Sequence, residues 1–258
     1  MFCFTDATGE VLSGVLRPGN AGANTVTDHL CVLDAAIAQL PASIAVGHES
    51  GDDAASAHRT VVVRADSAGC TEGFLAGGRE CNVSFFVTAR SNPQVTAAVC
   101  DAIGIETVWA PARAQAGDLR QRAAVCELTS PITHDKLPAG TRLIVRREPL
   151  HPDAQGSLFR SLEFRYWGFY TDAEGSLVEL DATMLAHALV ERHIQQLKDS
   201  GLSRMPFTNF EANANWMMAV AMSADLVRWF QLLRFDGSWV DARPQAMRWG
   251  IFHVTGPR

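Results

Sequence analysis

DATMLAHALVERHIQQLKDSG, residues Asp181–Gly201, is the stretch around which the rest of the chain is read. It contains no proline, and its one glycine is the last residue, a natural helix C-cap, so it predicts a helix. At about 100° per residue, one side of this helix is apolar, with Leu185, Ala186, Leu189, Val190, Ile194 and Leu197. The other side carries Met184, His187, Glu191, Gln195 and Lys198.

Two charged residues on the polar side, Glu191 and Lys198, are seven positions apart. In a helix this separation corresponds to about 10 Å along the axis. The distance is too long for a direct ion pair, but both side chains can meet one phosphate backbone. The polar side is therefore either the solvated face of an ordinary amphipathic helix, which the spacing alone favours, or a surface that contacts nucleic acid.

Length and composition place the chain among soluble globular proteins. It has 258 residues, of which 47% are hydrophobic and 19% charged, and this fits one large domain or a domain with an insertion. The formal net charge is −6, whereas nucleic-acid-binding domains usually carry a basic excess. Contact with DNA would therefore require a local basic surface or a further segment of protein.

The cysteines and the apolar segments indicate a cytoplasmic protein. The six cysteines form no CxxC pair, and we recognise no signal peptide, so we expect reduced and mostly buried thiols. The best candidate for a membrane helix, Ala212–Ala224, has only 13 residues and contains two asparagines. Because about 20 residues are needed to cross a bilayer, we expect no membrane segment.

The first part of the chain predicts alternating strands and helices. Phe2–Phe4 and Val11–Arg17 predict a hairpin, and Thr27 or Asp28 is expected to cap a helix that ends before Pro41. Two buried strands and two helices are expected to follow, namely the strands Thr60–Ala65 and Asn82–Ala89 and the helices Thr71–Gly78 and Asn92–Ile103.

Between residues 106 and 180 the pattern changes to strands separated by Pro/Gly turns. The expected strands are Val125–Leu128, Thr141–Arg147, Leu162–Tyr170 and Leu177–Leu180. Later, Glu211–Leu233 is apolar on nearly all sides and predicts a buried helix, while Arg243–Arg258 shows no clear element. We therefore expect an α/β core formed by residues 1–105 and 181–258, with a β-rich insertion at 106–180.

Asp66 stands at the C-terminal end of the expected strand Thr60–Ala65, where open α/β sheets gather ligands. A carboxylate at this place, together with Glu191 from the later helix, could hold Mg²⁺, which takes oxygen ligands. The alternative for Asp66 is a turn or helix N-cap residue. Arg146-Arg147 is also open to two explanations, a phosphate patch or a solvated strand edge.

Several other kinds of site are excluded because their sequence motifs are absent. The chain has no GxSxG nucleophile elbow, no GxxxxGK[ST] phosphate loop and no HExxH zinc motif. RPGNAG (Arg17–Gly22) is a weak candidate for a phosphate loop and is better explained as a turn.

Three separated blocks, Leu12–Pro41, Val61–Gly69 and His187–Leu202, resemble bacterial insertion-sequence transposases of the DDE type, in the same order. The chain is most similar to the branch whose last catalytic helix carries a Y-x2-R-x3-E-x6-K signature. The resemblance extends over essentially the whole chain and includes a β-rich insertion before the Glu. It implies a ribonuclease-H-like α/β fold, a mixed sheet flanked by helices, in which two Asp and one Glu hold two divalent metals.

Matched position by position, the resemblance assigns Asp66 as the second catalytic Asp and Glu191 as the Glu. Both would be metal ligands. Lys198 matches the Lys of the signature and is an expected DNA contact, whereas His187 falls on the Arg and Met184 on the Tyr. Half of the signature is therefore altered.

The resemblance also concerns the start of the chain. Arg17 and Asn20 are expected to be supporting polar residues that contact DNA. In the family, the first catalytic Asp lies on a central strand upstream of the hairpin that opens this chain, and Asp6 matches a turn residue instead. We therefore expect a truncated copy without that Asp and without the N-terminal DNA-binding region. Neighbours of the missing strand would keep unpaired backbone groups, which predicts poor solubility or self-association.

The implied function is that of a transposase catalytic domain, which uses Mg²⁺ or Mn²⁺ to hydrolyse phosphodiesters and transfer strands at the terminal inverted repeats of a mobile element. A homodimer is expected for the complete protein. The alternative is an inactive remnant, or an inhibitor that acts through DNA or through full-length transposase. A third possibility, an α/β hydrolase or another metal-dependent nuclease, has no motif of its own in this sequence.

Overall fold

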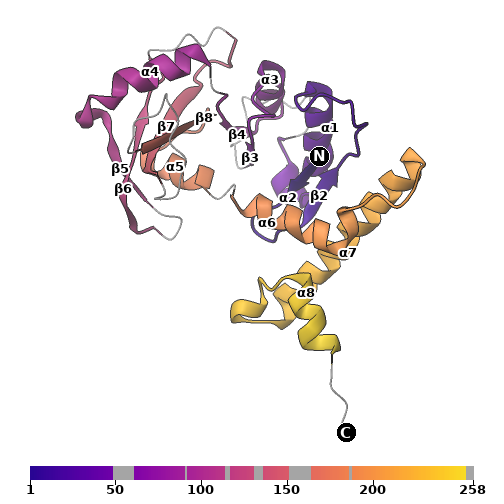
Figure 1. The fold of residues 1–258 in the computed structure, drawn as a ribbon. Helices are drawn as coiled ribbons and strands as arrows, with labels where there is room; N and C mark the ends of the chain where they lie inside the picture. The colour runs from indigo at the N-terminus through magenta and orange to yellow at the C-terminus, as the bar shows by residue number, and fades with distance from the viewer. Residues whose placement is uncertain are drawn as a thin grey trace. The chain divides into compact units, whose positions relative to one another are not determined.

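A computed structural model describes residues 1–48, 61–90, 92–113, 117–130, 136–150, 164–185 and 188–253 (Figure 1). The strands are β1 (Phe2–Phe4), β2 (Val11–Gly14), β3 (Val62–Ala65), β4 (Ser84–Thr88), β5 (Ala110–Arg113), β6 (Leu119–Glu127), β7 (Arg142–Pro149) and β8 (Phe164–Thr171). The longer helices are α1 (Val26–Ile37), α3 (Glu72–Glu80), α4 (Pro93–Ile103), α5 (Leu177–Leu185), α6 (Ala188–Leu197) and α7 (Phe210–Arg234). Shorter helical segments are α2 (Ala42–Ala45), Glu106–Val108, Lys198–Leu202, Gly237–Trp239, α8 (Pro244–Met247) and Arg248–Phe252.

The chain forms two compact units. One comprises residues 1–21, 31–40 and 188–258, and the other comprises residues 22–30 and 41–187. The first unit contains the β1–β2 hairpin and helices α6, α7 and α8. The second contains a six-stranded sheet with helices α3, α4 and α5.

The six-stranded sheet is mixed and has the order β3-β4-β8-β7-β6-β5. Strands β3 and β4 run parallel, and every other neighbouring pair is antiparallel. The strands of the 106–180 region thus continue the sheet that β3 and β4 begin. A mixed sheet flanked by helices confirms the predicted fold class.

Capping side chains fix the helices that lead into and out of β4. Thr71 accepts a hydrogen bond from the backbone N–H of Phe74 at the start of α3. Asn92 accepts one from Val95 at the start of α4, whose first residue is a proline. Both are favourable N-caps because a helix begins with unpaired N–H groups. These two helices confirm the sequence prediction to within a few residues.

Strand β3 lies at the edge of its sheet, so the expectation of a strand buried on both sides was wrong. Within the described residues it pairs with β4 alone, and Val62 is 44% exposed. By contrast, Phe85 and Val87 in β4 are fully buried, as predicted. A run of β-branched residues therefore marked a parallel strand correctly but did not give its position in the sheet.

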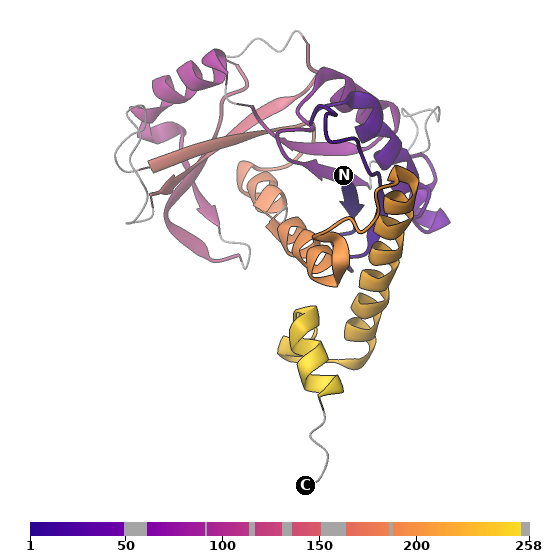
Figure 2. The ribbon, with the colours of Figure 1, turned by 45° about the vertical axis from the view of Figure 1, so that its right-hand side comes forward.

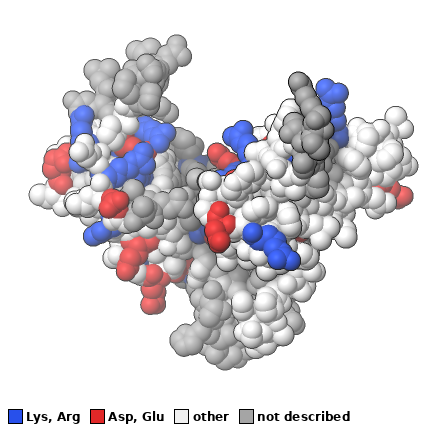
Figure 3. Space-filling model, turned by 90° about the horizontal axis from the view of Figure 1, so that it is seen from below, with Lys and Arg blue, Asp and Glu red and all other residues white. Residues whose placement is uncertain are grey.

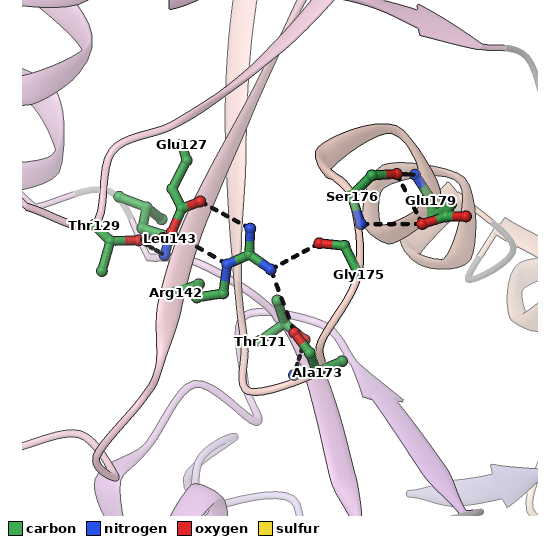
Figure 4. Close-up of polar contacts among 9 residues, drawn as sticks. All are labelled: Glu127, Thr129, Arg142, Leu143, Thr171, Ala173, Gly175, Ser176 and Glu179. Carbon is green, nitrogen blue, oxygen red and sulfur yellow. Dashed lines mark hydrogen bonds and ion pairs between the residues drawn. The ribbon is translucent and has the colours of Figure 1, made fainter.

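Residues 177–180 form the first turn of helix α5, not the strand that was expected. The carboxylate of Glu179 accepts hydrogen bonds from the N–H and hydroxyl of Ser176, which is the arrangement of a capping box (Figure 4). Leu180 and Met184 pack with Ile144 in the core beneath the sheet. The helical spacing of these apolar residues, and not an alternation, therefore describes the segment.

The central stretch Asp181–Gly201 is helical on both sides of residues 186 and 187, so the prediction of one continuous helix stays a prediction. Helix α5 ends at Leu185 and α6 begins at Ala188, with residues 186 and 187 outside the described part of the chain. Met184 was expected on the polar side, but it is buried. Gly201 lies at φ 132° within the turn after α6, a conformation that L-residues rarely adopt.

Helix α7 was expected to be buried, and this expectation was wrong for a large part of its surface. Met217 and Val220 are buried, whereas Leu226 and Phe230 are exposed. Figure 2 shows the length of α7 and the short α8 beyond its C-terminal end. The region after residue 243 also contains α8 and a further helical turn, which the sequence did not reveal.

The cysteines are all free, in agreement with the expected reduced thiols. Only Cys81 and Cys126 are buried, however, and Cys31 and Cys100 are exposed, so the expectation of mostly buried thiols was wrong. Among the described residues, no helix is both long enough and apolar enough to cross a bilayer.

Candidate functional site

Asp66 lies directly after β3 and its side chain is exposed. One carboxylate oxygen, Oδ1, accepts a hydrogen bond from the N–H of Ala68 at 2.8 Å, so Asp66 shapes a local turn. Arg90, which follows β4, donates to the carbonyl oxygens of Ser67 and Ala68 at 2.8 and 3.3 Å. The carboxyl ends of the parallel strands β3 and β4 therefore hold the Asp66 turn in place.

Glu191 and Lys198 come from α6 and from the turn that follows it, and both are exposed. The opposite side of α6 is fixed by His193, whose ring stacks on Phe4 at 5.5 Å and lies against Gly9. Burial lowers the pKa of His193, which favours the neutral ring in this apolar contact. The packing of His193 against the β1–β2 hairpin thus orients α6 so that Glu191 lies on its exposed side.

The remaining predicted residues differ in how the structure presents them. Asn20 is exposed, in a turn closed by a hydrogen bond from the N–H of Ala21 to the carbonyl of Pro18. Arg17 is half-buried. His187 lies outside the described residues. This turn agrees with the prediction that Arg17–Gly22 is a turn and not a phosphate loop.

The two predicted metal ligands belong to different compact units, Asp66 to one and Glu191 to the other. Within the described residues, no group of three or more His, Cys, Asp or Glu side chains is placed to hold a metal ion. The convergence of Asp66 and Glu191 on one cation therefore stays a prediction.

A comparison with protein families assigns the chain. The profile of the family described as "Transposase DDE domain group 1" matches residues 1–257. The chain belongs to this transposase DDE domain family. No curated protein matches the chain. The family and the mixed sheet together agree with the ribonuclease-H-like fold that the sequence blocks implied.

The surface charges of this transposase domain are mixed. On the face shown in Figure 3, basic and acidic side chains of the described residues lie among one another and form no continuous basic area. This matches the net charge of −6. Recognition of DNA by this face would therefore depend on individual basic residues and not on a broad positive field.

A buried ion network in the sheet was missed at the sequence level. Arg146 on β7 donates to Glu148 at 2.6 Å and also to Asp181 on α5, and the side chains of Arg146 and Asp181 are 0% exposed. Glu148 additionally pairs with Arg120 from β6 and with Arg165 from β8. The network therefore joins three strands and a helix.

Burial and charge act in opposite directions within this network. Burial raises the pKa of Asp181 to about 6, although Arg146 opposes the shift. Burial also acts to raise the pKa of Glu148, but hydrogen bonds from Arg165 and Arg146 outweigh it and hold that pKa below its ordinary value. Glu148 is thus ionised at neutral pH, whereas Asp181 takes up a proton once the pH falls to about 6.

Arg146 and Arg147 need separate descriptions, and neither predicted explanation fits the pair. Arg146 is buried in the network, which excludes both a phosphate patch and a solvated edge for this residue. Arg147 points to the other face of β7, where it stacks on Trp109 at 4.7 Å and pairs with Glu106 at 2.6 Å. The sequence contained a signal for this burial. Side chains alternate between the two faces of a strand, so Arg146 lies on the same face of β7 as the apolar Ile144.

Proposed function

We propose that this domain is part of a transposase that hydrolyses and joins DNA phosphodiesters at the ends of an insertion sequence, and that it contributes Asp66 and Glu191 as ligands of a divalent metal. The family match over residues 1–257 carries this proposal. Two features of the structure support it. Asp66 follows directly on a strand of the mixed sheet, and Glu191 projects from a helix whose other face is packed.

The chemistry of the two side chains fits Mg²⁺ or Mn²⁺. Carboxylate oxygens are the hard donors that these ions take, and a magnesium site usually keeps several waters. Both Asp66 and Glu191 are exposed, so a hydrated ion can approach either carboxylate. The hydrogen bond that Asp66 accepts from the N–H of Ala68 uses only Oδ1.

The chain's own residues would bind and orient the DNA. A bound divalent ion supplies polarisation of a phosphoryl oxygen and a more acidic water or 3′-hydroxyl. Lys198 would donate to a backbone phosphate from the same helical region that presents Glu191, as a point charge with three N–H donors. Arg17 and Asn20 would contact the DNA backbone from the turn after the hairpin, and His187 would take the place of the Arg in the signature.

We also propose that this polypeptide alone does not cut DNA. The sequence comparison assigns only two of the three carboxylates that the two-metal chemistry uses. Two carboxylates would hold a metal more weakly than three, and the two-metal mechanism of this chemistry uses both ions to stabilise the attacking and the leaving oxygen.

Metal binding and cleavage test these two statements separately. In a Mn²⁺ titration followed by electron paramagnetic resonance, Asp66→Ala and Glu191→Gln should each weaken binding at least tenfold. The control Glu211→Gln, an exposed carboxylate at the start of α7, should leave binding unchanged. Equal Mn²⁺ affinity in all four proteins would exclude the proposed ligand pair.

Cleavage is tested with a labelled duplex that carries the terminal inverted repeats of the element encoding the chain. We expect no nick in the presence of Mg²⁺ or Mn²⁺. A metal-dependent nick that Asp66→Ala abolishes would show that the chain is competent by itself. It would also support the ligand assignment while refuting the proposed inactivity.

A second candidate function is an inactive remnant that inhibits full-length transposase, and the altered signature favours it. Met184 stands at the Tyr position and is buried in the core, where it cannot contact DNA. Adding the chain to a transposition assay with the full-length enzyme discriminates the candidates. Dose-dependent inhibition supports this function, and unchanged transposition removes it.

A further inference from the structure

Arg90 follows the carboxyl end of β4, beside the turn that carries Asp66. Strands β3 and β4 are parallel neighbours, so their last residues lie at one edge of the sheet (Figure 1). The register pairs Ala65 with Val87, and Asp66 and Arg90 follow shortly after that pair on their respective strands. The two side chains therefore come from adjacent strand ends, although they are far apart in the sequence.

The guanidinium group of Arg90 binds the backbone of the Asp66 turn through two donors. Its Nε donates to the carbonyl oxygen of Ser67 at 2.8 Å, and its Nη2 donates to that of Ala68 at 3.3 Å. A planar guanidinium group presents its N–H groups in a fixed fork. Two bonds to consecutive carbonyls therefore fix the orientation of the turn as well as its position.

The turn is also closed by its own hydrogen bonds, and these end on Asp66. The N–H of Ala68 donates to Oδ1 of Asp66 at 2.8 Å, and the N–H of Gly69 donates to the backbone carbonyl of Asp66 at 3.1 Å. A Cβ added at Gly69 would lie only 2.7 Å from the Cβ of Ala65, so the turn folds back closely onto the end of β3. Because Ala68 binds Arg90 through its carbonyl and the carboxylate through its N–H, Arg90 restrains Oδ1 through a single residue.

The backbone from which Arg90 extends is fixed by the core of the sheet. Strand β4 pairs with β3 on one side and with β8 on the other, and Val87 is fully buried. The N–H of Ala89, the residue directly before Arg90, donates to the carbonyl of Gly168 on β8 at 2.8 Å. The contact between Arg90 and the Asp66 turn therefore connects an exposed turn to a rigid strand, which is how precise sites are supported.

We propose that Arg90 is a positioning residue, which holds the Asp66 turn in the orientation in which the carboxylate binds a divalent cation. This inference rests on the proposed function, because it takes Asp66 as a metal ligand. A guanidinium group so close to the ligand also repels a cation. Loss of its charge alone would therefore tighten metal binding, whereas loss of its two hydrogen bonds would weaken it. The direction of the change in affinity separates the two effects.

A Mn²⁺ titration of the full chain, followed by electron paramagnetic resonance, measures this direction. Arg90→Gln should weaken binding about tenfold, as the loss of groups that orient metal ligands commonly does. Arg90→Lys keeps the charge without the fork and should weaken binding as well. The matched control is Arg113→Gln, because Arg113 donates to the carbonyl of Gly117 at 2.8 Å in another turn of the same compact unit. It should bind Mn²⁺ like the wild type.

Three results of this titration overturn an assignment, and they can be told apart. Unchanged or tighter binding in Arg90→Gln, or wild-type affinity in Arg90→Lys, overturns the positioning role. If Asp66→Ala weakens binding in the same experiment, the proposed function still stands. Unchanged affinity in Asp66→Ala removes the proposed ligand, and the positioning role with it.

Amide hydrogen exchange of the metal-free chain, measured residue by residue by NMR, tests the restraint on the turn without any metal. Arg90→Gln should speed exchange at the N–H of Ala68 several-fold, because the turn that holds it opens more often. The N–H of Val87 in β4 should keep its protection, which shows that the sheet is intact. Unchanged exchange at Ala68 in Arg90→Gln would overturn the inference.

Discussion

The substitution Asp181→Asn gives a direct test of the buried network. In the folded protein Asp181 is fully buried beside Arg146, and its pKa is raised to about 6 from an ordinary value of 3.8. A carboxyl whose pKa is raised by folding binds its proton more tightly in the native state. Its contribution to stability is therefore complete below pH 3.8 and is lost as the pH rises through 6.

The magnitude follows from the two pKa values. At pH 7.5 both states are ionised, so the group contributes almost nothing to the pH dependence. At pH 5 the native state is mostly protonated and the unfolded state is mostly ionised, which is worth about 1.4 kcal/mol. Acidification from pH 7.5 to pH 5 should thus stabilise the wild type by that amount through Asp181, and Asp181→Asn should not show this gain.

Urea unfolding at pH 5.0, 6.0 and 7.5, followed by circular dichroism, measures the effect. The quantity to compare is the difference in unfolding free energy between wild type and Asp181→Asn at each pH, because contributions of titrating groups that are not coupled to Asp181 cancel in it. That difference should change by about 1.4 kcal/mol in favour of the wild type at pH 5. A difference that is constant from pH 5 to pH 7.5 would refute the reasoning.

Three further outcomes follow from burial and backbone geometry. Met184→Ala should lower the free energy of unfolding by about 2–5 kcal/mol, because it leaves a cavity in the core under the sheet. Gly201→Ala should cost about 1–3 kcal/mol, because φ is 132° and the added Cβ would lie 3.1 Å from the Trp216 ring. At pH 8 a thiol reagent should modify the exposed Cys100 rapidly and leave Cys126 unmodified, since burial raises the pKa of Cys126 to about 12.

Matched controls separate these effects from general damage. Met205→Ala removes an exposed methionine and should change stability by less than about 0.5 kcal/mol. Gly237→Ala changes a glycine at φ 60° with open space around it, so it should cost less than Gly201→Ala. The first two predictions fail if each control matches its partner in urea unfolding. Modification of Cys126 in the folded protein at the rate of Cys100 would contradict the third.

The sequence predicted helices and strands well where the spacing of apolar residues fitted only one kind of element. The expected helices Thr71–Gly78 and Asn92–Ile103 and the expected strands Thr141–Arg147 and Leu162–Tyr170 lie close to the observed bounds of α3, α4, β7 and β8. The segment at residues 177–180 was misread because four apolar or acidic residues satisfy both periods. The capping box formed by Ser176 and Glu179 decides for a helix.

Burial was harder to predict than secondary structure. The pattern of α7 predicts a helix that is apolar on nearly all sides, but composition does not state what covers each side, and Leu226 remains exposed. Similarly, β3 has the residues of a central strand and lies at an edge. In both cases the prediction required knowing which other segment packs against the surface. The periodicity of a single segment does not give that information.

The candidate site was only partly accessible from the sequence. Periodicity placed Asp66 at a strand end and Glu191 on an exposed helical face, as the structure has them. Whether the two carboxylates meet depends on distances that local patterns do not encode, so their shared metal stays a prediction, as does the division at residues 105 and 180. Arg146 was misread because an arginine pair normally points to solvent, and its partner Asp181 lies 35 residues away.

The ion network of β7 also restricts how this strand can pair with its neighbours. Side chains alternate along a strand, so a slip of one residue exchanges its two faces. In one direction the slip would place Val145 against Asp181, leaving a buried carboxylate without a cation. In the other direction Pro149 would stand where Glu148 forms ion pairs with three arginines. Because β7 has apolar residues on both faces, burial of apolar side chains alone would not distinguish the correct register from a slipped one. The ion pairs make the slipped registers less stable.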